Sequence, residues 1–469
     1  MTGDTSPQLQ RKIEASLRYS VRDAASFSVM LGAGESYFQA FAVFLRGTLM
    51  QVGAIYSVPM FLGSLAQLLS TWAVRRVGSR KRLVVAAALT RTALFIPMVL
   101  VPFMGPQRVW ILLGLISLYF ALNYIGVPAW TSWMRDLVAE SRRGQYFSRR
   151  NSLANLVALV GVVAAGVVLS LYPKDSPRGF FLILAVAFLG SVGSTVFLAL
   201  KLDLPYEEPR RSGESLLRFT ASLGRNHYGR FVLFTALLHF GVFLAGPFFV
   251  PYMLNTLGFD YLQFMVATSL VVAVKFLAMP VWGELSDRYG NRKILALASI
   301  LVSLLPFTWM AGRSFWWICL IQGIGGLAWA GFDIAALNFA YDLMPAEKVT
   351  RYTSFNAFYK GVAIFLGGLA GGFLIHHIQL FGSPFNALFG LSGAFRVAVA
   401  LPLLLLLKEV RVVEHISYRN LMFKLISMGP RRGMQLLVIG RKDAGVPRKP
   451  PARRAEASVD GAEEGGDGG

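Results

Sequence analysis

Several ionisable side chains lie inside long runs of apolar residues. If these runs cross a membrane, each charge costs about 2.5 to 3.5 kcal/mol on insertion scales, so such residues are usually retained for substrate binding or for proton and ion movement. Each is therefore a functional candidate. The set consists of Glu35, Arg91, His239, Lys275, Asp333, Lys360 and Arg396.

Glu35 is the leading candidate for a group that carries a proton. It lies in the sequence GAGESYF, near the middle of an apolar run, and has no evident charged partner. Burial favours the neutral form of a carboxyl group, so Glu35 can gain and lose a proton as its access to water changes. The alternative is a carboxyl group held protonated or hydrogen-bonded where two helices touch.

Two lysines and an aspartate lie at a similar depth in later runs. Lys275 precedes Gly283 by eight residues and Asp333 precedes Asp342 by nine, which places both about 12 to 14 Å from a charged end at roughly 1.5 Å per residue. Lys360 enters from that end to a similar depth. Two lysines beside one aspartate stabilise its ionised form, which favours a structural or anion-attracting role over protonation.

The remaining charged candidates have structural alternatives. A single histidine in an apolar helix is most often packed and hydrogen-bonded, although it titrates near neutrality. Packing or snorkelling of a long side chain explains Arg91, whereas Arg396 has no explanation from the sequence. Further polar groups that suit a small-molecule site are Asn123, Tyr124 and Gln322.

The runs that hold these residues indicate a membrane protein. Of 469 residues, 55% are hydrophobic and 15% charged, and the mean hydropathy is +0.54, which exceeds what a soluble core of this length buries. About twelve runs of roughly 18 to 25 residues recur, each long enough to cross a hydrocarbon core of about 30 Å. They lack the alternation of barrel strands, so we predict an all-α membrane protein with twelve transmembrane helices.

The distribution of charge predicts the orientation. The formal net charge is +21, but the basic residues lie between apolar runs and not on a soluble face, which argues against a nucleic-acid partner. They concentrate in every second connection and in both tails, so the positive-inside rule places those connections and both termini in the cytoplasm. The single cysteine, Cys319, lies inside a span, so no internal disulfide and no metal centre are expected.

The chain divides into five expected segments. The N-terminal one lacks the apolar run and cleavage site of a secretory signal peptide. The tail begins with apolar and basic residues at helical spacing, which suits a helix on an anionic membrane face or one packed on its own protein. The segments are a cytoplasmic stretch 1–22, a six-helix half 23–201, a cytoplasmic linker 202–229, a second six-helix half 230–408 and a basic cytoplasmic tail 409–469, disordered after about 441.

The two halves repeat each other in sequence. A shift of 212 residues places RRVGSRK (residues 75–81) on DRYGNRK (residues 287–293), and it pairs Gly34 with Gly246 and Gln51 with Gln263. A shift of 206 residues places the loop that begins at Asp136 on the loop that begins at Asp342. Two parallel halves joined by a linker are typical of transporters that bind substrate midway between halves that move against each other.

The second copy of this loop resembles the signature of the major facilitator superfamily. In the segment GELSDRYGNRKIL (residues 283–295) the matching residues are Gly283, Asp287, Arg288, Gly290, Arg292 and Lys293. The first copy keeps Arg76 and Gly78, but Thr71 and Arg75 replace the glycine and the aspartate. The stretch 130–151 resembles a poorly characterised bacterial branch of the family. The resemblance covers roughly residues 20–410 and implies two pseudo-symmetric halves of six helices.

The resemblance also implies a cavity and a gate. In this family spans one, four, seven and ten line the cavity and spans two, five, eight and eleven lie beside them, which would bring Lys275, Asp333 and Lys360 into one cluster that faces the cavity. The signature loop is expected to form a cytoplasmic gate in which Asp287 pairs with Arg288, Arg292 or a helix end when that side is closed. Asp136 and Asp342 belong to the equivalent gate loops. The alternative is that these residues form ordinary surface ion pairs.

These observations predict a transporter. The leading hypothesis is a secondary active transporter that moves a small organic solute across the cell (inner) membrane by alternating access, coupled to protons. The alternative is a non-transporting membrane sensor or a lipid-moving protein on the same fold. The sequence has no GxxxxGK[ST] loop and no Ser/His/Asp constellation, so ATP-driven transport, an enzyme and a cofactor are not expected. The expected partners of a monomer are the substrate, protons and membrane lipids.

Overall fold

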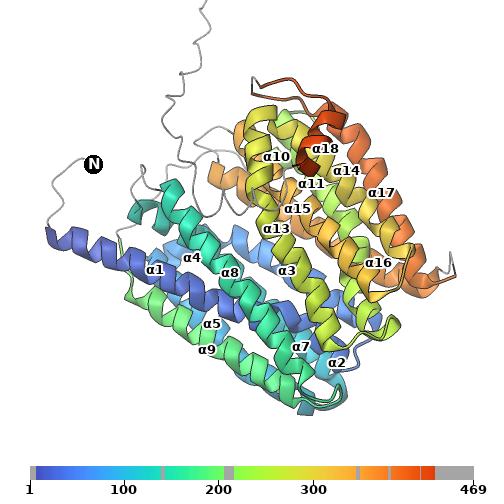
Figure 1. Ribbon diagram of the computed structural model, residues 1–469. Helices are drawn as coiled ribbons and strands as arrows, with labels where there is room; N and C mark the ends of the chain where they lie inside the picture. The colour runs from blue at the N-terminus through green and yellow to red at the C-terminus, as the bar shows by residue number, and fades with distance from the viewer. Residues whose placement is uncertain are drawn as a thin grey trace, which may run out of the picture.

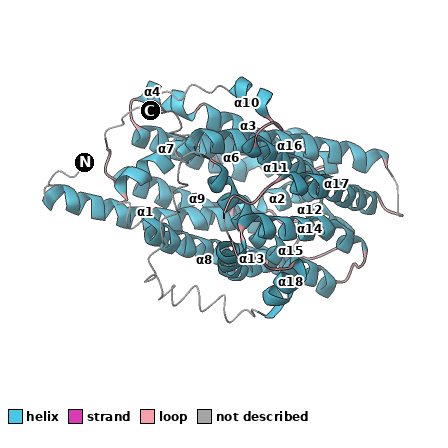
Figure 2. Ribbon diagram, turned by 90° about the horizontal axis from the view of Figure 1, so that it is seen from above, coloured by secondary structure: helices cyan, strands magenta, loops and turns pink. Residues whose placement is uncertain are grey.

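Every regular element of the described chain is a helix (Figures 1 and 2). The structure is a computed structural model that describes residues 7–138, 143–204, 216–344, 349–378, 382–411 and 413–427. The helices of the first half are α1 (Pro7–Ala33), α2 (Phe38–Phe44), α3 (Leu49–Leu68), α4 (Ser70–Val77), α5 (Arg80–Ala93), α6 (Phe95–Leu100), α7 (Arg108–Leu137), α8 (Arg143–Ser170) and α9 (Arg178–Leu200). They are followed by α10 (Leu216–Ser222), α11 (His227–Ala245), α12 (Phe249–Pro251), α13 (Tyr261–Tyr289), α14 (Asn291–Met310), α15 (Phe315–Leu343), α16 (Val349–His377), α17 (Pro384–Leu406) and α18 (Tyr418–Ser427).

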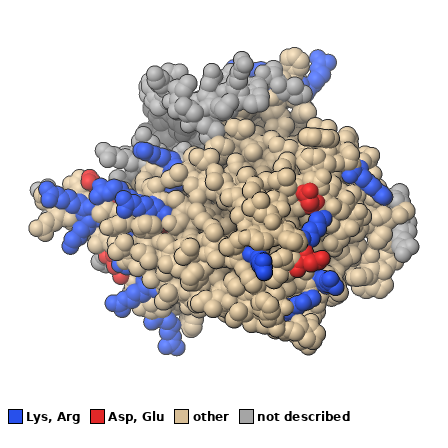
Figure 3. Space-filling view, turned by 60° about the horizontal axis from the view of Figure 1, so that its bottom comes forward, with Lys and Arg blue, Asp and Glu red and all other residues tan. Residues whose placement is uncertain are grey.

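These helices form the twelve predicted spans. Eleven stretches of the described chain are long and apolar enough to cross a bilayer. The first span falls outside this set because α1 begins with charged residues and a 3-10 turn, Glu35–Tyr37, separates it from α2. Large apolar side chains such as Leu171, Leu189 and Leu405 are exposed, as contact with lipid requires. On the face shown in Figure 3, basic side chains gather at the left, where α1 begins, and much of the surface is uncharged.

Within each half the helices pack on one another, and fewer helices make contacts between the halves. In the first half α1 packs on α8 and α9, and α3 packs on α7; in the second, α11 packs on α16 and α17, and α13 packs on α15. The halves meet along α3 with α16 and along α8 with α13. At the first of these seams, a Cβ atom on Gly368 would lie 2.5 Å from the Cβ of Ser57, so glycine permits the close approach of the two helices.

The structure confirms the sequence repeat at equivalent helix ends. Gln51 and Gln263, which the 212-residue shift pairs, occupy the same position in two capping boxes, with Thr48 and Asp260 as the N-cap residues of α3 and α13. The first and seventh spans are both interrupted at the paired glycines, with 3-10 turns at Glu35–Tyr37 and Gly246–Phe248.

The contacts between the halves lie away from one end of the bundle. We call the end at which α1 begins and α4 and α13 end the basic end. Two hydrogen bonds join the halves: Gln39 donates to the carbonyl oxygen of Pro247, and Lys174 donates to that of Phe259, both at 3.2 Å. Two pairs of stacked rings also join them, Tyr56–Phe243 and Phe61–Phe365. In Figure 1 the halves converge at the lower right and diverge toward the start of α1 and toward α10 and α18. Among the described residues, the helices of the two halves therefore diverge toward the basic end.

A buried ion cluster fixes α1 to its neighbours near the basic end. Asp23 of α1 accepts hydrogen bonds from Lys201 Nζ at 2.8 Å and from Ser194 Oγ at 2.7 Å, and Arg150 Nη2 lies 3.8 Å from the same carboxylate. Lys201 also lies over the rings of Trp130 and Trp133. The cluster joins α1, α8 and α9 and so positions the helix that leads to Glu35.

Candidate functional site

Glu35 lies on the interruption of the first span, at the wall of a cavity. The cavity has a volume of about 200 Å³, and Ser36, Gln39 and Tyr56 also line it. Glu35 is half-buried. Because Gln39 and Tyr56 both contact the second half, Glu35 lies directly beside contacts that hold the two halves together.

The structure corrects the view that Glu35 has no partner. Tyr119 of α7 donates a hydrogen bond from its hydroxyl to Glu35 Oε2 at 2.8 Å. Arg91 of α5 lies behind Tyr119, with its guanidinium carbon 5.9 Å from the centre of the Tyr119 ring, and donates to Asn123 Oδ1 at 2.8 Å. These residues form one polar path through the first half, which we call the Glu35 network.

Arg91 does not snorkel. Its side chain is 4% exposed, and its Nε and Nη2 have no hydrogen-bond partner among the described residues. A buried guanidinium with two free donors is costly unless a negative charge lies near, and Glu35 is within electrostatic range. The ionised form of Glu35 is therefore matched by a buried cation. Tyr124, also a candidate, donates from its hydroxyl to Met60 Sδ at 3.4 Å between α7 and α3.

The structure brings together the predicted cluster of the second half. Lys275 of α13 forms an ion pair with Asp333 of α15, and both side chains are about one-third exposed, at 34% and 39%. Lys360 of α16 lies within electrostatic range of both. The Lys275 and Asp333 side chains thus lie well inside their helices and remain partly accessible. Gln322 lies on α15 about three turns from Asp333.

His239 and Arg396 lie in the packed interior of the second half. His239 is buried with Nδ1 2.7 Å from the carbonyl oxygen of Thr235, and its ring packs against Trp329 and Phe332. It lies within electrostatic range of Lys360.

Arg396 has a structural explanation that the sequence did not supply. Its Nη1 donates to the carbonyl oxygen of Val302 at 3.0 Å, and its Nη2 donates to that of Val242 at 3.3 Å. Pro306 lies four residues after Val302 in α14 and has no N–H, so the Val302 carbonyl has no helical donor. Arg396 replaces that donor.

The hydrogen bonds of Arg80, which follows the loop with Arg76 and Gly78, are made within the first half. Arg80 is 2% exposed and donates from Nη1 to Asp136 Oδ2 at 2.6 Å and to Ser132 Oγ at 2.9 Å. The turn before it is made by Gly78, which has a positive φ of 73°. Arg76 lies at the surface over the ring of Trp72. The residue that binds Asp136 is thus Arg80, which the repeat aligns with Arg292 but which we did not place in the gate.

The second gate loop is bound by the chain that follows α17. Asp342 accepts hydrogen bonds from Asn291 Nδ2 at 2.5 Å and Arg411 Nε at 2.8 Å. Arg292 donates from Nε to the carbonyl oxygen of Leu407 at 2.5 Å, and its backbone N–H donates to Glu409 Oε2 at 2.8 Å.

In the described chain Arg288 and Arg292 bind acceptors other than Asp287, and the pairing of Asp287 when the cytoplasmic side is closed stays a prediction. Arg288 donates to Glu414 Oε2 at 2.7 Å, Lys293 donates to the carbonyl oxygen of Ile416 at 3.0 Å, and Asp287 is exposed. Gly290 supplies the turn with a φ of 92°. Gly283 lies one turn before Asp287 in α13 and is half-buried.

The same acidic anchor occurs in both halves. Asp203, three residues after α9, accepts a hydrogen bond from Ser79 Oγ at 2.8 Å. Glu409, three residues after α17, accepts one from the backbone N–H of Arg292, the residue after the one that the 212-residue shift pairs with Ser79. The 206-residue shift aligns Asp203 with Glu409. That alignment is the sequence feature from which these two acidic residues could have been predicted.

Comparisons with known proteins agree with this arrangement. A family model described as Major Facilitator Superfamily matches residues 24–238 and 231–439. The tetracycline resistance protein, class H, of Pasteurella multocida is 32% identical over 110 residues, which span 23% of this chain and only 27% of that protein. The citrate-proton symporter of Klebsiella pneumoniae is 27% identical over 368 residues, 71% of this chain and 74% of that protein. The structure of a variant of the nucleoside transporter NupG matches with a TM-score of 0.64 at 15% identity, over 84% of this chain and 100% of that one, which is a likeness of fold.

Proposed function

Because the chain belongs to the Major Facilitator Superfamily, we propose that it is a secondary active transporter that moves a small organic solute by alternating access, coupled to protons through Glu35. We place the basic end and both termini in the cytoplasm of a bacterial cell, in line with the positive-inside rule. In that orientation the described conformation is inward-open, because the contacts between the halves lie away from the basic end.

The Glu35 network supports the proton-coupling role. Glu35 is half-buried at a cavity wall, so it can exchange a proton with water in the open state. Tyr119 and Arg91 stabilise the carboxylate, and loss of its charge leaves Arg91 buried without a counter-charge. Protonation thereby changes the energetics of the wall that carries Gln39 and Tyr56. These two residues must separate from Pro247 and Phe243 when the opposite end opens.

The balance of charge inside the bundle supports an organic anion as the substrate class. Lys275 and Lys360 lie beside a single carboxylate, Asp333, and in the first half Arg91 lies behind Glu35. The cluster of the second half is therefore net positive, and the Glu35 network becomes so when Glu35 is protonated. The likeness to a citrate-proton symporter supports the same choice.

The proposal is tested by ligand-induced stabilisation followed by transport. Detergent-purified protein is screened by thermal unfolding against carboxylates, nucleosides and tetracyclines, since a ligand of the folded state raises apparent stability. A stabilising ligand is then supplied to proteoliposomes that contain a pH-sensitive dye. We expect solute uptake with proton movement, and loss of the proton movement in Glu35→Gln.

The matched control is Glu14→Gln, which changes an exposed glutamate on α1, the helix that precedes Glu35. This control is expected to transport normally. Proton movement that persists in Glu35→Gln, or uptake that is indifferent to pH in the unmodified protein, would refute the coupling role.

The segment boundaries given above and the monomeric state belong to the same proposal. The linker is described only on either side of residues 205–215. Helix α10 packs Phe219 against Tyr228 at the start of α11 and against Tyr352 and Phe355 of the second half. The stretch after about 441, expected to be disordered, lies outside the described residues.

A further inference from the structure

The chain after α17 folds back over the second gate loop. Glu414 is bound to Arg288 both through its side chain and through its backbone N–H, which donates to the Arg288 carbonyl oxygen at 3.2 Å. Helix α18 packs on the protein through Leu421 and Leu425, which are 0% and 7% exposed. Lys424, on the same helix, donates a hydrogen bond to the hydroxyl of Tyr289 at the end of α13.

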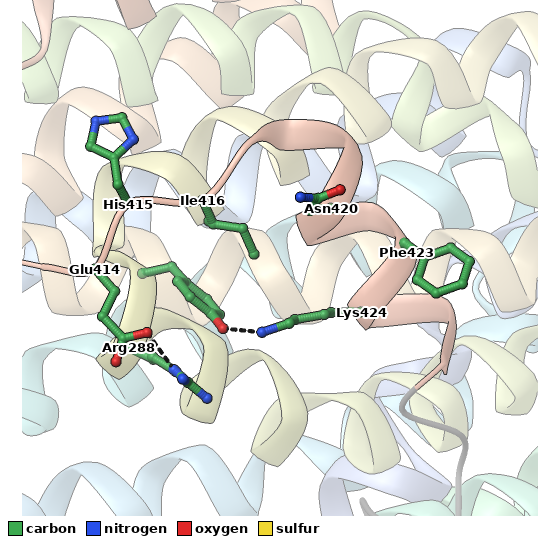
Figure 4. Close-up of a pocket in the computed structure, with 8 residues that line it drawn as sticks. Arg288, Glu414, His415, Ile416, Asn420, Phe423 and Lys424 are labelled. Carbon is green, nitrogen blue, oxygen red and sulfur yellow. Dashed lines mark hydrogen bonds and ion pairs between the residues drawn. The ribbon is translucent and has the colours of Figure 1, made fainter.

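This packing leaves a basic groove between α18 and the end of α13. The groove has a volume of about 310 Å³. Arg288 and Lys424 lie on two sides of the groove (Figure 4), and Tyr289 also lines it. The guanidinium carbon of Arg288 lies 5.3 Å from the centre of the Tyr289 ring, and Lys424 Nζ lies 4.9 Å from it. His415 and Asn420 also line the groove, and Glu414 is its single acidic residue.

The two basic side chains can share one anion. Glu414 engages Nε of Arg288, while Nη1 and Nη2 have no hydrogen bond among the described residues. A guanidinium presents those two donors in the geometry that matches the oxygens of a phosphate group. Lys424, whose Nζ lies near the same ring, adds a second positive charge.

The surroundings of the groove favour a lipid over a soluble anion. Phe423 is 74% exposed, and Tyr418 of the same helix is 46% exposed. Leu405 at the end of α17 and Val410 in the chain that follows it are 77% and 52% exposed. Aromatic and apolar side chains beside basic ones at the end of a span are typical of segments at the membrane interface.

We propose that this groove binds the phosphate headgroup of an anionic phospholipid from the cytoplasmic leaflet, between Arg288 and Lys424, with Phe423 and Tyr418 among the acyl chains. The inference rests on the proposed orientation, which places the basic end at that leaflet. The site lies at the second gate loop, apart from the cavity that holds Glu35. Lipid bound there ties the tail to the gate.

The test measures lipid binding without transport. The full-length protein in neutral detergent is titrated with short-chain phosphatidylglycerol, with phosphatidylcholine of the same chain length and with inorganic phosphate, and thermal unfolding is followed. We expect saturable stabilisation by phosphatidylglycerol only. Lys424→Gln should raise the half-maximal lipid concentration about fivefold, the effect of one basic residue near an anionic surface.

Two further variants make the result specific. Lys424→Arg should restore binding, and Arg419→Gln, which removes an exposed arginine of α18 that does not line the groove, should bind like the unmodified protein. Because the readout is the lipid concentration at half effect, a lower unfolding temperature in a variant does not obscure it.

Three outcomes would overturn the inference. Equal stabilisation by phosphatidylcholine would show that headgroup charge is not recognised. An equal effect of inorganic phosphate would identify a soluble anion as the occupant. Equal weakening by Arg419→Gln and Lys424→Gln would show a diffuse electrostatic effect. None of these results bears on transport, so failure here leaves the proposed function standing, and the Glu35 experiments test that separately.

Discussion

Removal of the Asp23 carboxylate should destabilise the first half strongly. Asp23 and Lys201 are 4% and 1% exposed, and Asp23→Asn leaves the Lys201 ammonium buried without its counter-charge. Loss of one partner of a buried ion pair costs about 3 to 5 kcal/mol. We therefore expect a decrease of that size in the free energy of unfolding, measured by thermal or denaturant unfolding of the purified protein.

The pH dependence provides an independent check on the Asp23 prediction. Burial lowers the pKa of Lys201 from its usual value of 10.5, and the nearby Asp23 opposes this lowering. Between the lowered pKa and 10.5 the unfolded chain binds more protons than the folded one, so stability rises with pH in that window. Without Asp23 the window widens, because the opposing charge is gone. The deficit of Asp23→Asn should therefore shrink as the pH is raised.

Two comparisons separate this explanation from a general effect of substitution. Asp260→Asn is the matched control, because Asp260 is an exposed N-cap of α13 and asparagine caps a helix equally well. The double variant Asp23→Asn with Lys201→Met should recover most of the lost stability, since it removes the buried ammonium that Asp23→Asn leaves without a counter-charge. A loss below about 1 kcal/mol in Asp23→Asn, or no recovery in the double variant, would refute the reasoning.

Three other predictions follow from the described contacts. Arg396→Met should cost less in a Pro306→Ala background, because the restored N–H supplies the Val302 carbonyl; a double-mutant cycle should give a coupling of about 1 to 3 kcal/mol, and additive losses would contradict it. Hydrogen exchange of residues 407–411 should increase more in Asp342→Asn than in Glu414→Gln. The reason is that Asp342, which pairs with Arg411, is 9% exposed, whereas both partners of the Arg288–Glu414 pair are more than half exposed. The reverse order would contradict this assignment. Asp333→Asn should strengthen binding of an organic anion and Lys275→Gln should weaken it, so equal weakening by both would argue against an anionic substrate.

The sequence predicts most of the architecture because bilayer thickness and the repeat constrain it. Apolar runs of the right length give the twelve spans, and the 212-residue shift correctly pairs the interruptions at Gly34 and Gly246. The number of residues between a side chain and the nearest loop gives its depth in the membrane. This depth is similar for Lys275 and Asp333, which form an ion pair in the structure.

What the sequence does not supply is the rotation of each helix. Membrane helices are apolar on all sides, so periodicity does not show which face of α5 or α7 turns inward. For that reason Tyr119 and Arg91 were not recognised as partners across the Glu35 network. The tail was ambiguous for a related reason: its basic and apolar spacing suits either a membrane or a protein surface, and the contacts of Arg411 and Leu421 determine that it packs on the second half.

The measurement that tests the account most directly is the distance between the two halves at the basic end. Val77 and Tyr341 are 39% and 49% exposed near the basic ends of α4 and α15, and Val77→Cys with Tyr341→Cys in a Cys319→Ala background accepts a pair of spin labels. Alternating access controlled by Glu35 predicts a long and a short distance whose populations change with pH, and no change with pH in Glu35→Gln. A single distance that is independent of pH in the protein with Glu35, or the same pH response in Glu35→Gln, would contradict the account.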